Sequence, residues 1–216
     1  MAVILILTTD CKKETEDTPE TVTDVDGNVY TTVTIGTQTW MVENLKATTY
    51  NDGTPISLVT DNNQWKNLNA AAFCWYANDA ATYKNPYGAL YNWYAVNTGK
   101  LCPSGWHVPT HAEWTELTDY FGGGTVAGGS LKESGTMHWA SPNVDATNES
   151  GFTGLPGGAR QDGGFLFIGV SGSWWSATEY NSEWAYERGL NYNSGNVFWV
   201  NFNPKTNGYS VRCLKD

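Results

Sequence analysis

The sequence is poor in cysteine and contains no paired cysteine motif. Its four cysteines, Cys11, Cys74, Cys102 and Cys213, include no C-x-x-C pair, which is the spacing of many zinc sites and of thioredoxin-like redox centres. The sequence therefore gives no basis for either kind of site. Cysteines this widely spaced fit one long-range disulfide with single thiols left over, in an oxidising compartment.

Basic residues and long apolar runs are also scarce. The chain has 12 Lys and Arg against 22 Asp and Glu, for a formal net charge of -10. No basic patch accompanies the aromatic runs, so nucleic acid is a poor partner on electrostatic grounds. Seven of the acids lie between positions 10 and 26, so part of the acidity belongs to a tail. Beyond the first few residues, no apolar run is long enough to span a bilayer.

Large rings and glycines are abundant instead. The 216 residues include 11 Trp, 12 Tyr and 23 Gly. This length suits one all-β or α+β domain, or at most two small ones. Trp and Tyr provide much buried area and also form rigid, amphipathic contact surfaces, and glycines on this scale indicate many tight turns.

The N-terminal segment is typical of the end of a bacterial lipoprotein signal. Residues 1–7 are apolar, and Thr8, Thr9, Asp10, Cys11 and a polar stretch follow. This order predicts that Cys11 carries a lipid and tethers the protein to a cell-surface membrane by that anchor alone. The segment lacks a basic n-region and its apolar run is short, which an upstream start codon would explain. The alternative is a β-branched strand or a frayed terminus. We expect residues 1–24 to form the signal-like segment with an acidic linker, and residues 25–216 to form the domain.

The first part of the domain predicts a β-hairpin. Residues 29–35 alternate and are rich in β-branched side chains, Gly36 and Thr37 supply a turn, and residues 38–42 form the second strand. The preceding Asp24-x-Asp26-Gly27-Asn28 pattern faintly resembles a calcium loop. It lacks the later ligands and the closing Glu, so we interpret it as a turn.

Two helices are expected, followed by strands. Residues 87–96 show helical spacing after Asn85-Pro86, and Thr110 to Glu113 form a capping box ahead of Trp114, Leu117 and Phe121. After Gly151 no helical period occurs. Short strands are expected at residues 163–165, 169–175, 185–192, 196–202 and 209–214. This pattern predicts an α+β domain.

The order of these motifs resembles the Fibrobacter succinogenes major paralogous domain, a family akin to C-type-lectin and formylglycine-generating-enzyme-like folds. The resemblance covers almost the whole chain. The matching stretches are residues 26–30, 35–45, 87–95, 102–109, 113–114, 147–152, 155–158, 174–179 and 208–213, among them Ile35-Gly36-Thr37-Gln38-Thr39-Trp40, Cys102-Pro103-Ser104-Gly105-Trp106-His107 and Gly208-Tyr209-Ser210-Val211-Arg212-Cys213.

The resemblance implies a C-type-lectin-like fold with two helices, a mixed and mostly antiparallel sheet, and long loop-rich insertions. In such a fold the two chain ends meet in one sheet, with the last strand central and beside the region after the first helix. On that basis we expect Cys102 to pair with Cys213, which leaves Cys74 as a buried free thiol. A bridge from Cys74 to either of these cysteines is the competing arrangement.

Such domains are also similar to the variable proteins of diversity-generating retroelements, whose C-terminal codons are rewritten at adenines. Residues 180–207 fit such a segment in composition, since they are rich in Asn, Tyr, Ser and Trp and precede the framework-like residues 208–213. An imperfect DNA repeat of this segment beside a reverse-transcriptase gene, with mismatches confined to adenines, would be the genomic signature of this process.

The same segment predicts a ligand-binding face. Phe198, Trp199 and Phe202 lie between polar loops, and exposed rings with a polar rim mark interaction surfaces. A plain structural strand is the alternative. Trp174 and Trp175 belong to a framework motif, so we expect them in the core. The predicted ligand-binding residues are Tyr180, Glu183, Trp184, Tyr186, Glu187, Arg188, Asn191, Tyr192, Asn193, Phe198, Trp199, Val200, Asn201, Phe202 and Asn203.

We therefore expect a non-enzymatic adhesin or receptor-type protein that takes a protein or glycan ligand and needs no cofactor. The rival hypotheses are a redox or metal enzyme and a structural surface-layer or pilus-associated component. No Ser/His/Asp order suggests a triad. The Glu-Pro-Asn, Gln-Pro-Asp and Trp-Asn-Asp tripeptides of calcium-dependent lectins do not occur. His107, His111 and Glu113 are the candidates for a metal, but framework and capping roles account for them.

Overall fold

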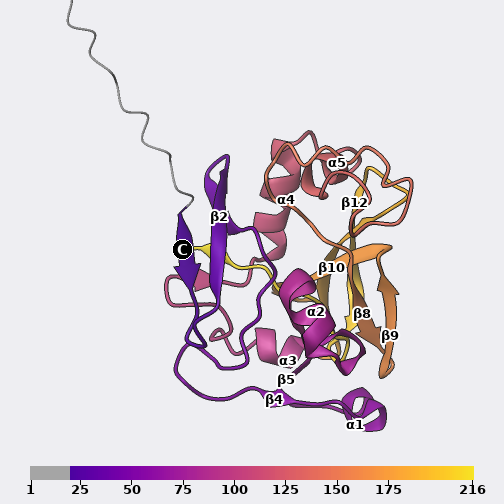
Figure 1. Ribbon diagram of the computed structural model, residues 1–216. Coiled ribbons are helices and arrows are strands. Elements are labelled where there is room, and N and C mark those ends of the chain that lie inside the picture. The colour runs from indigo at the N-terminus through magenta and orange to yellow at the C-terminus, as the bar shows by residue number, and fades with distance from the viewer. Residues whose placement is uncertain (1–19) are drawn as a thin grey trace, which may run out of the picture.

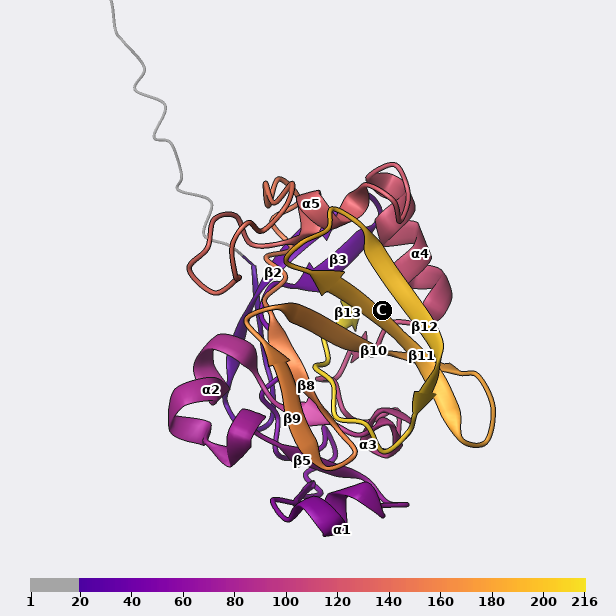
Figure 2. The same ribbon diagram turned by 90° about the vertical axis from the view of Figure 1, so that its right-hand side faces the viewer.

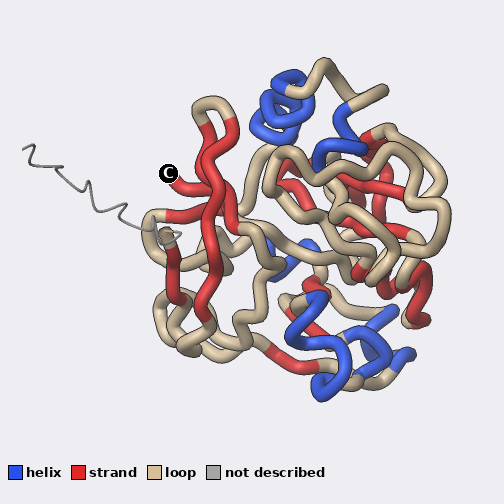
Figure 3. The backbone as a smooth tube through the Cα atoms, turned by 45° about the horizontal axis from the view of Figure 1, so that its top comes forward, coloured by secondary structure: helices blue, strands red, loops and turns tan. Residues whose placement is uncertain are grey.

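The computed structural model describes residues 20–216, which form three β-sheets with short helices between them (Figure 1). The lipidation predicted at Cys11 lies outside the described residues. Loops connect most elements (Figure 3), in agreement with the high glycine content. Within residues 20–216 no helix is long and apolar enough to cross a membrane.

The first sheet joins the two ends of the described chain, as the resemblance predicted. It contains β1 (Thr21–Thr23), β2 (Val29–Ile35), β3 (Gln38–Met41), β13 (Leu214–Lys215) and β7 (Trp106–His107) in the order β1-β2-β3-β13-β7, and all of its pairs are antiparallel. The β2–β3 hairpin is confirmed. Because β1 pairs with β2, the ordered domain begins within the segment that we had assigned to signal and linker. The Asp24 carboxylate accepts hydrogen bonds from the Asp26 and Asn28 amides and from the Tyr30 hydroxyl, so it closes a turn.

The second sheet carries the C-terminal strands. It contains β8 (Gly157–Gln161), β9 (Gly164–Ile168), β10 (Ser171–Glu179), β11 (Trp184–Asn191) and β12 (Val197–Pro204) in the order β12-β11-β10-β8-β9, and Figure 2 shows β10, β11 and β12 side by side. Only the β8–β10 pair is parallel. The expected strands at 163–165, 169–175, 185–192 and 196–202 correspond to β9, β10, β11 and β12.

The expected strand at residues 209–214 is largely wrong. Only Leu214 and Lys215 form a strand, while Gly208, Tyr209 and Ser210 make single bridges to Arg160, Tyr91 and Trp174 respectively. The β-branched and aromatic pattern is present, but successive residues pair with different elements. This segment therefore links the sheets instead of lengthening one of them.

A small third sheet and the helices complete the domain. The sheet contains β4 (Ser57–Leu58), β5 (Ala72–Cys74) and β6 (Leu90–Tyr91). The helices are α1 (Asn62–Lys66), the 3-10 turn η1 (Tyr76–Asn78), α2 (Ala80–Tyr87), α3 (Trp93–Val96), α4 (His111–Tyr120) and α5 (Ala127–Leu131). Of the described α-helices, only α2 and α4 exceed five residues. The α+β class is confirmed.

The predicted helix at 87–96 is wrong, whereas the helix after Thr110 is confirmed. Helix α2 precedes the expected position and ends at Gly88, which has φ +74° and where a Cβ would lie 2.7 Å from the Leu45 carbonyl oxygen. Strand β6 and the single turn of α3 follow, and both face the core, which produced the helix-like spacing. In α4, the Thr110 hydroxyl and the Glu113 carboxylate form the predicted capping box.

The core is rich in aromatic rings. Trp174 and Trp175 are both buried, as expected, and because neighbouring strand residues point to opposite faces they enter different clusters. Trp174 packs with Trp114 and Phe152, at 6.4 and 6.1 Å between ring centroids. Trp175 packs against Tyr209 at 4.6 Å.

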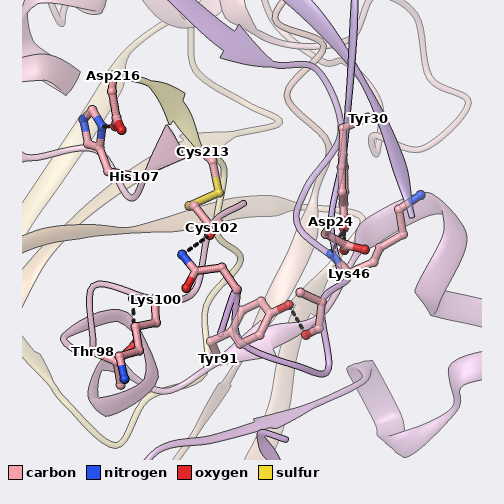
Figure 4. The surroundings of a disulfide bond; sticks show 12 residues. Asp24, Tyr30, Lys46, Tyr91, Thr98, Lys100, Cys102, His107, Cys213 and Asp216 are labelled. Atoms are coloured by element: carbon pink, nitrogen blue, oxygen red, sulfur yellow. Dashed lines mark hydrogen bonds and ion pairs between the residues drawn. A yellow bond between two sulfur atoms is a disulfide. The ribbon is translucent and has the colours of Figure 1, made fainter. Parts of the chain in front are cut away.

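The predicted disulfide between Cys102 and Cys213 is confirmed, with a Cα–Cα distance of 6.0 Å (Figure 4). Cys74 is a buried free thiol, also as expected. The disulfide ties the residue before β13 to the loop before β7. It therefore fastens the end of the chain into the middle of the first sheet.

Candidate functional site

The β11–β12 hairpin separates the predicted ligand-binding residues onto two faces of the second sheet. Along β11, Tyr186 and Arg188 point toward α4, whereas Glu187 between them points to the other side. Along β12, Trp199 lies on the α4 side and Phe198 and Val200 lie opposite. The sequence had placed all of these residues on one face.

Five of the predicted rings form two neighbouring groups on the hairpin, which together we call the aromatic face: Tyr180, Tyr186 and Trp199 in one group, and Trp184 and Phe202 in the other. Tyr180 and Tyr186 lie 5.9 Å apart between ring centroids, Tyr186 and Trp199 6.1 Å, and Trp184 and Phe202 5.7 Å. These separations lie within the range of favourable aromatic contacts.

The aromatic face is exposed to solvent. Trp199 is 55% exposed, Phe202 57% and Tyr180 49%, and Trp184 and Tyr186 are partly exposed. Tyr192 is half-buried and packs against a core cluster. Trp199 and Phe202, on which the binding hypothesis chiefly rests, are therefore free to contact a ligand.

Helix α4 adds His111 to the aromatic face, which the sequence had presented only as a capping and metal candidate. The His111 ring lies 4.4 Å from Tyr186 and 5.3 Å from Trp199 between centroids. Burial and the neighbouring Arg188 guanidinium lower the pKa of His111. The imidazole is therefore neutral at pH 7, and its contribution to this face is that of an aromatic ring with one polar edge.

Arg188 supports the aromatic face from beneath and is not part of it. It is buried, and its guanidinium donates to the His111 ring at 3.0 Å, to the His111 carbonyl oxygen at 3.1 Å and to the Thr115 hydroxyl at 3.0 Å. These bonds hold β11 against the first turn of α4. The prediction that Arg188 belongs to the exposed face is therefore wrong, because strand β11 is covered by α4 at this position.

The opposite side of the hairpin contains a cavity of about 280 Å³, which we call the polar pocket. Five predicted residues line it: Glu187, Asn191, Phe198, Val200 and Asn203. Glu187 and Asn203 are buried, so their assignment to the exposed face is also wrong. Asn203 donates to the Glu187 carboxyl at 2.9 Å and accepts from the Tyr209 hydroxyl at 2.9 Å.

The remaining predicted residues lie at the two ends of the hairpin. Glu183 is exposed in the turn before β11, and Asn201 is half-buried in β12. Asn193 is exposed in the turn between β11 and β12, and Gly195 and Asn196 of the same turn lie against Gly128 of α5. Buried Lys132 anchors this turn by donating to the carbonyl oxygens of Asn191 and Ser194 at 3.1 and 2.8 Å.

The metal candidates do not converge. His107 contacts Glu113 at 3.0 Å and Asp216 at 2.7 Å, whereas His111 turns away toward Arg188. Burial lowers the pKa of His107, but the hydrogen bonds with Asp216 and Glu113 outweigh this effect and raise the pKa overall. Within residues 20–216 no group of three His, Cys, Asp or Glu side chains is arranged to hold a metal ion.

Cys74 is poorly suited to thiolate chemistry. It is fully buried, and this burial raises its pKa to about 12. The thiolate is the reactive form of cysteine, and it is disfavoured in such surroundings. Because Cys102 and Cys213 are joined to each other, neither of them forms a redox pair with Cys74.

Comparison with known protein families finds a match over most of the chain. The family described as Fibrobacter succinogenes major domain matches residues 33–215. Comparison with curated proteins finds no match, and neither does comparison with solved structures.

Proposed function

The chain belongs to the Fibrobacter succinogenes major domain family, and we propose that it is a non-enzymatic, surface-tethered binding protein of C-type-lectin-like fold. In this proposal the aromatic face binds a macromolecular ligand, a protein or a glycan. The observation that carries it is the exposure of Trp199 and Tyr180, which both contact Tyr186, and of Phe202, which contacts Trp184, on a hydrogen-bonded sheet.

Physical arguments support a binding role for these rings. An aromatic side chain left in water gives up most of the free energy that its burial would contribute, so a cluster of exposed rings marks an interaction surface. Tyr and Trp lose little conformational entropy on binding and often dominate binding energy. The Arg188 bonds to α4 hold the rings in place before a ligand arrives.

Replacing Trp199 and Phe202 together by Ala tests this function. We expect ligands selected with the wild-type protein from a glycan array or a displayed peptide library to bind the double variant at least ~100-fold more weakly, since each central ring typically contributes about 2 kcal/mol or more. Because both rings are more than half exposed, the free energy of unfolding should change by about 1 kcal/mol or less.

The matched control is Met137→Ala, which removes a side chain that is 85% exposed and outside the aromatic face. It should leave binding unchanged. Equal binding by the double variant and the wild type would refute the proposal. A loss of several kcal/mol of stability in the double variant would assign both rings to the core.

The proposed attachment to the membrane depends on Cys11. In a bacterial host that processes lipoproteins, Cys11→Ser should prevent incorporation of a labelled fatty acid and move the protein from the membrane fraction to the soluble fraction. The wild-type protein treated with a lipase serves as the control. Unchanged membrane attachment of Cys11→Ser would rule out this tether.

We also propose that a diversity-generating retroelement rewrites part of residues 180–207. The exposed positions of this segment, such as Asn181, Asn193 and Asn196, have room for other side chains. Asn203 and Asn207 instead hydrogen-bond the Tyr209 hydroxyl in the interior. We therefore expect diversification to spare these two residues.

A further inference from the structure

The polar pocket lies on the opposite side of the β11–β12 hairpin from the aromatic face, so what it binds does not depend on the function proposed above. Its floor is formed by Glu187, Asn203, Tyr209 and Ser173, and two of its walls by the rings of Phe167 and Phe198. A volume of about 280 Å³ is slightly below the range of sites for drug-sized ligands. The pocket is therefore large enough for a single side chain or a small molecule.

The Glu187 carboxyl group lacks a counter-ion. It is only 3% exposed, and within the described residues it forms no ion pair. No Lys, Arg or His lines the pocket. Arg188 follows Glu187 in the chain, but the Arg188 guanidinium lies on the α4 side of the strand, where it bonds to His111 and Thr115. An ionised carboxylate buried in this way is costly unless a positive charge accompanies it.

The walls of the pocket also suit a cation. The Phe198 ring lies directly over the backbone of Gly189, where a Cβ would come within 2.0 Å of the ring. Phe167, which also lines the pocket, is half exposed and has φ +67°. This backbone conformation is unfavourable for a bulky residue. Such strain is characteristic of functional sites. Faces of aromatic rings attract ammonium and guanidinium groups and also pack against their alkyl stems.

We propose that the polar pocket binds an alkylammonium or alkylguanidinium group, such as the end of a lysine or arginine side chain of a partner, as the counter-ion of Glu187. The cation pairs with the carboxylate on the floor, and its stem lies between Phe167 and Phe198. The net charge of -10 on the chain favours the approach of cations.

Titration with n-butylammonium, n-propylguanidinium and n-butanol tests the proposal. Binding is followed by NMR through the side-chain amide resonances of Asn203 and Gln161, both of which line the pocket. We expect the two cations to shift these resonances and butanol to bind at least ~10-fold more weakly. The variant Glu187→Gln should weaken cation binding by a factor of about 10 or more. The relative affinity of the two cations distinguishes a lysine-like ligand from an arginine-like one.

The matched control is Glu149→Gln, which changes the net charge equally at an exposed position outside the pocket. It should alter cation binding by less than a factor of about 2. Phe198→Leu provides a second variant that keeps Glu187, and it should weaken binding of both cations several-fold. The thermal unfolding curve of each variant confirms that it is folded.

Cation binding should also depend on pH. Burial raises the pKa of Glu187 to about 7, although hydrogen bonds from Ser173 and Asn203 and the charge of Arg188 on the other side of the strand oppose this shift. The other titratable side chain that lines the pocket is Tyr209, whose pKa is raised by burial and by Glu187, so it stays neutral in this range. Lowering the pH from 8 to 6 protonates Glu187 and should weaken cation binding by a factor of about 10.

Three outcomes would overturn the proposal. The first is equal cation binding by the wild type and Glu187→Gln. The second is butanol binding as tight as that of the cations. The third is displacement of the bound cations by methyl α-glucoside when the sugar is less concentrated than the cations. This result would identify the pocket as a sugar site. None of these outcomes bears on the aromatic face, which the Trp199 and Phe202 variant tests separately.

Discussion

Removing the disulfide by the double substitution Cys102→Ser and Cys213→Ser should lower the free energy of unfolding by about 4–5 kcal/mol. The disulfide joins residues 111 positions apart, and in the chain-entropy model a closed loop of this size restricts the unfolded chain by about that amount. For a domain of this length, the melting temperature should fall by about 10–20 °C. Urea unfolding and calorimetry measure the two quantities.

The position of the disulfide adds a structural reason for a large effect. Strand β13 is only two residues long, yet it lies between β3 and β7 in the first sheet. Cys213 directly precedes it, and the Cys102 carbonyl accepts a hydrogen bond from the Asn51 side chain at 3.0 Å. Without the disulfide, β13 is held by the pairing of Leu214 and Lys215 and by backbone hydrogen bonds such as that from the Met41 amide to the Cys213 carbonyl at 3.0 Å.

A reducing agent provides the control for this prediction. It should bring the wild-type protein to the stability of the double variant and leave the double variant unchanged. Cys74→Ala should cost only about 1 kcal/mol, because Cys74 is not cross-linked. A double variant within about 1 kcal/mol of the wild type would show that the sheet holds the chain end without the disulfide.

Replacing Arg212 by Met should destabilise the protein by about 3 kcal/mol. The guanidinium is almost completely buried between the two large sheets, where it donates to the Phe152 carbonyl and to the Asn44 side chain, the latter at 2.8 Å. It also lies over the Phe152 ring, 4.1 Å from the ring centroid. Burial lowers its pKa to about 9, so it remains charged at neutral pH.

The expected loss arises from the groups that Arg212 leaves behind. Met fills much of the volume but donates no hydrogen bond, so the buried Phe152 carbonyl loses its donor, which typically costs about 1–3 kcal/mol. The Asn44 side-chain oxygen loses one of two donors and keeps the Trp174 indole at 2.8 Å. The matched control is Lys215→Met, which removes a cation that is half exposed and paired with Glu20 at the surface. That change should alter stability by about 0.5 kcal/mol or less.

Urea unfolding of the Arg212 and Lys215 variants decides this prediction. If Arg212→Met were as stable as the wild type, apolar packing at this position would be sufficient, as has been found when some buried ionic groups are replaced. Arg212→Lys should recover part of the loss, because it keeps the charge but cannot reach all of the same acceptors.

Local patterns predicted the elements whose form depends on neighbouring residues. The capping box fixed the start of α4, and the alternation around Gly36 and Thr37 fixed the β2–β3 hairpin. The error at residues 87–96 has a different origin. Hydrophobic spacing reports which residues are buried, but it does not distinguish a helix from a strand followed by one turn when both face the same core.

For the candidate site, the sequence correctly indicated that Trp199 and Phe202 are exposed, because polar loops surround that strand. It gave no signal for the contribution of His111, which lies about 90 positions earlier in the chain and meets Trp199 only when α4 packs on the second sheet. Nor did it indicate that Phe167 lines the same pocket as Glu187.

The sequence by itself determined the family, the α+β class, the pairing of Cys102 with Cys213 that the family implied, and the segment that carries the exposed rings. Only the tertiary structure decided how that segment divides into an aromatic face and a polar pocket. The physical reason is that strand residues alternate between two faces, and what covers each face comes from distant parts of the chain. Helix α4 covers Arg188 on one side, whereas Glu187, its neighbour, remains at the floor of an open pocket on the other.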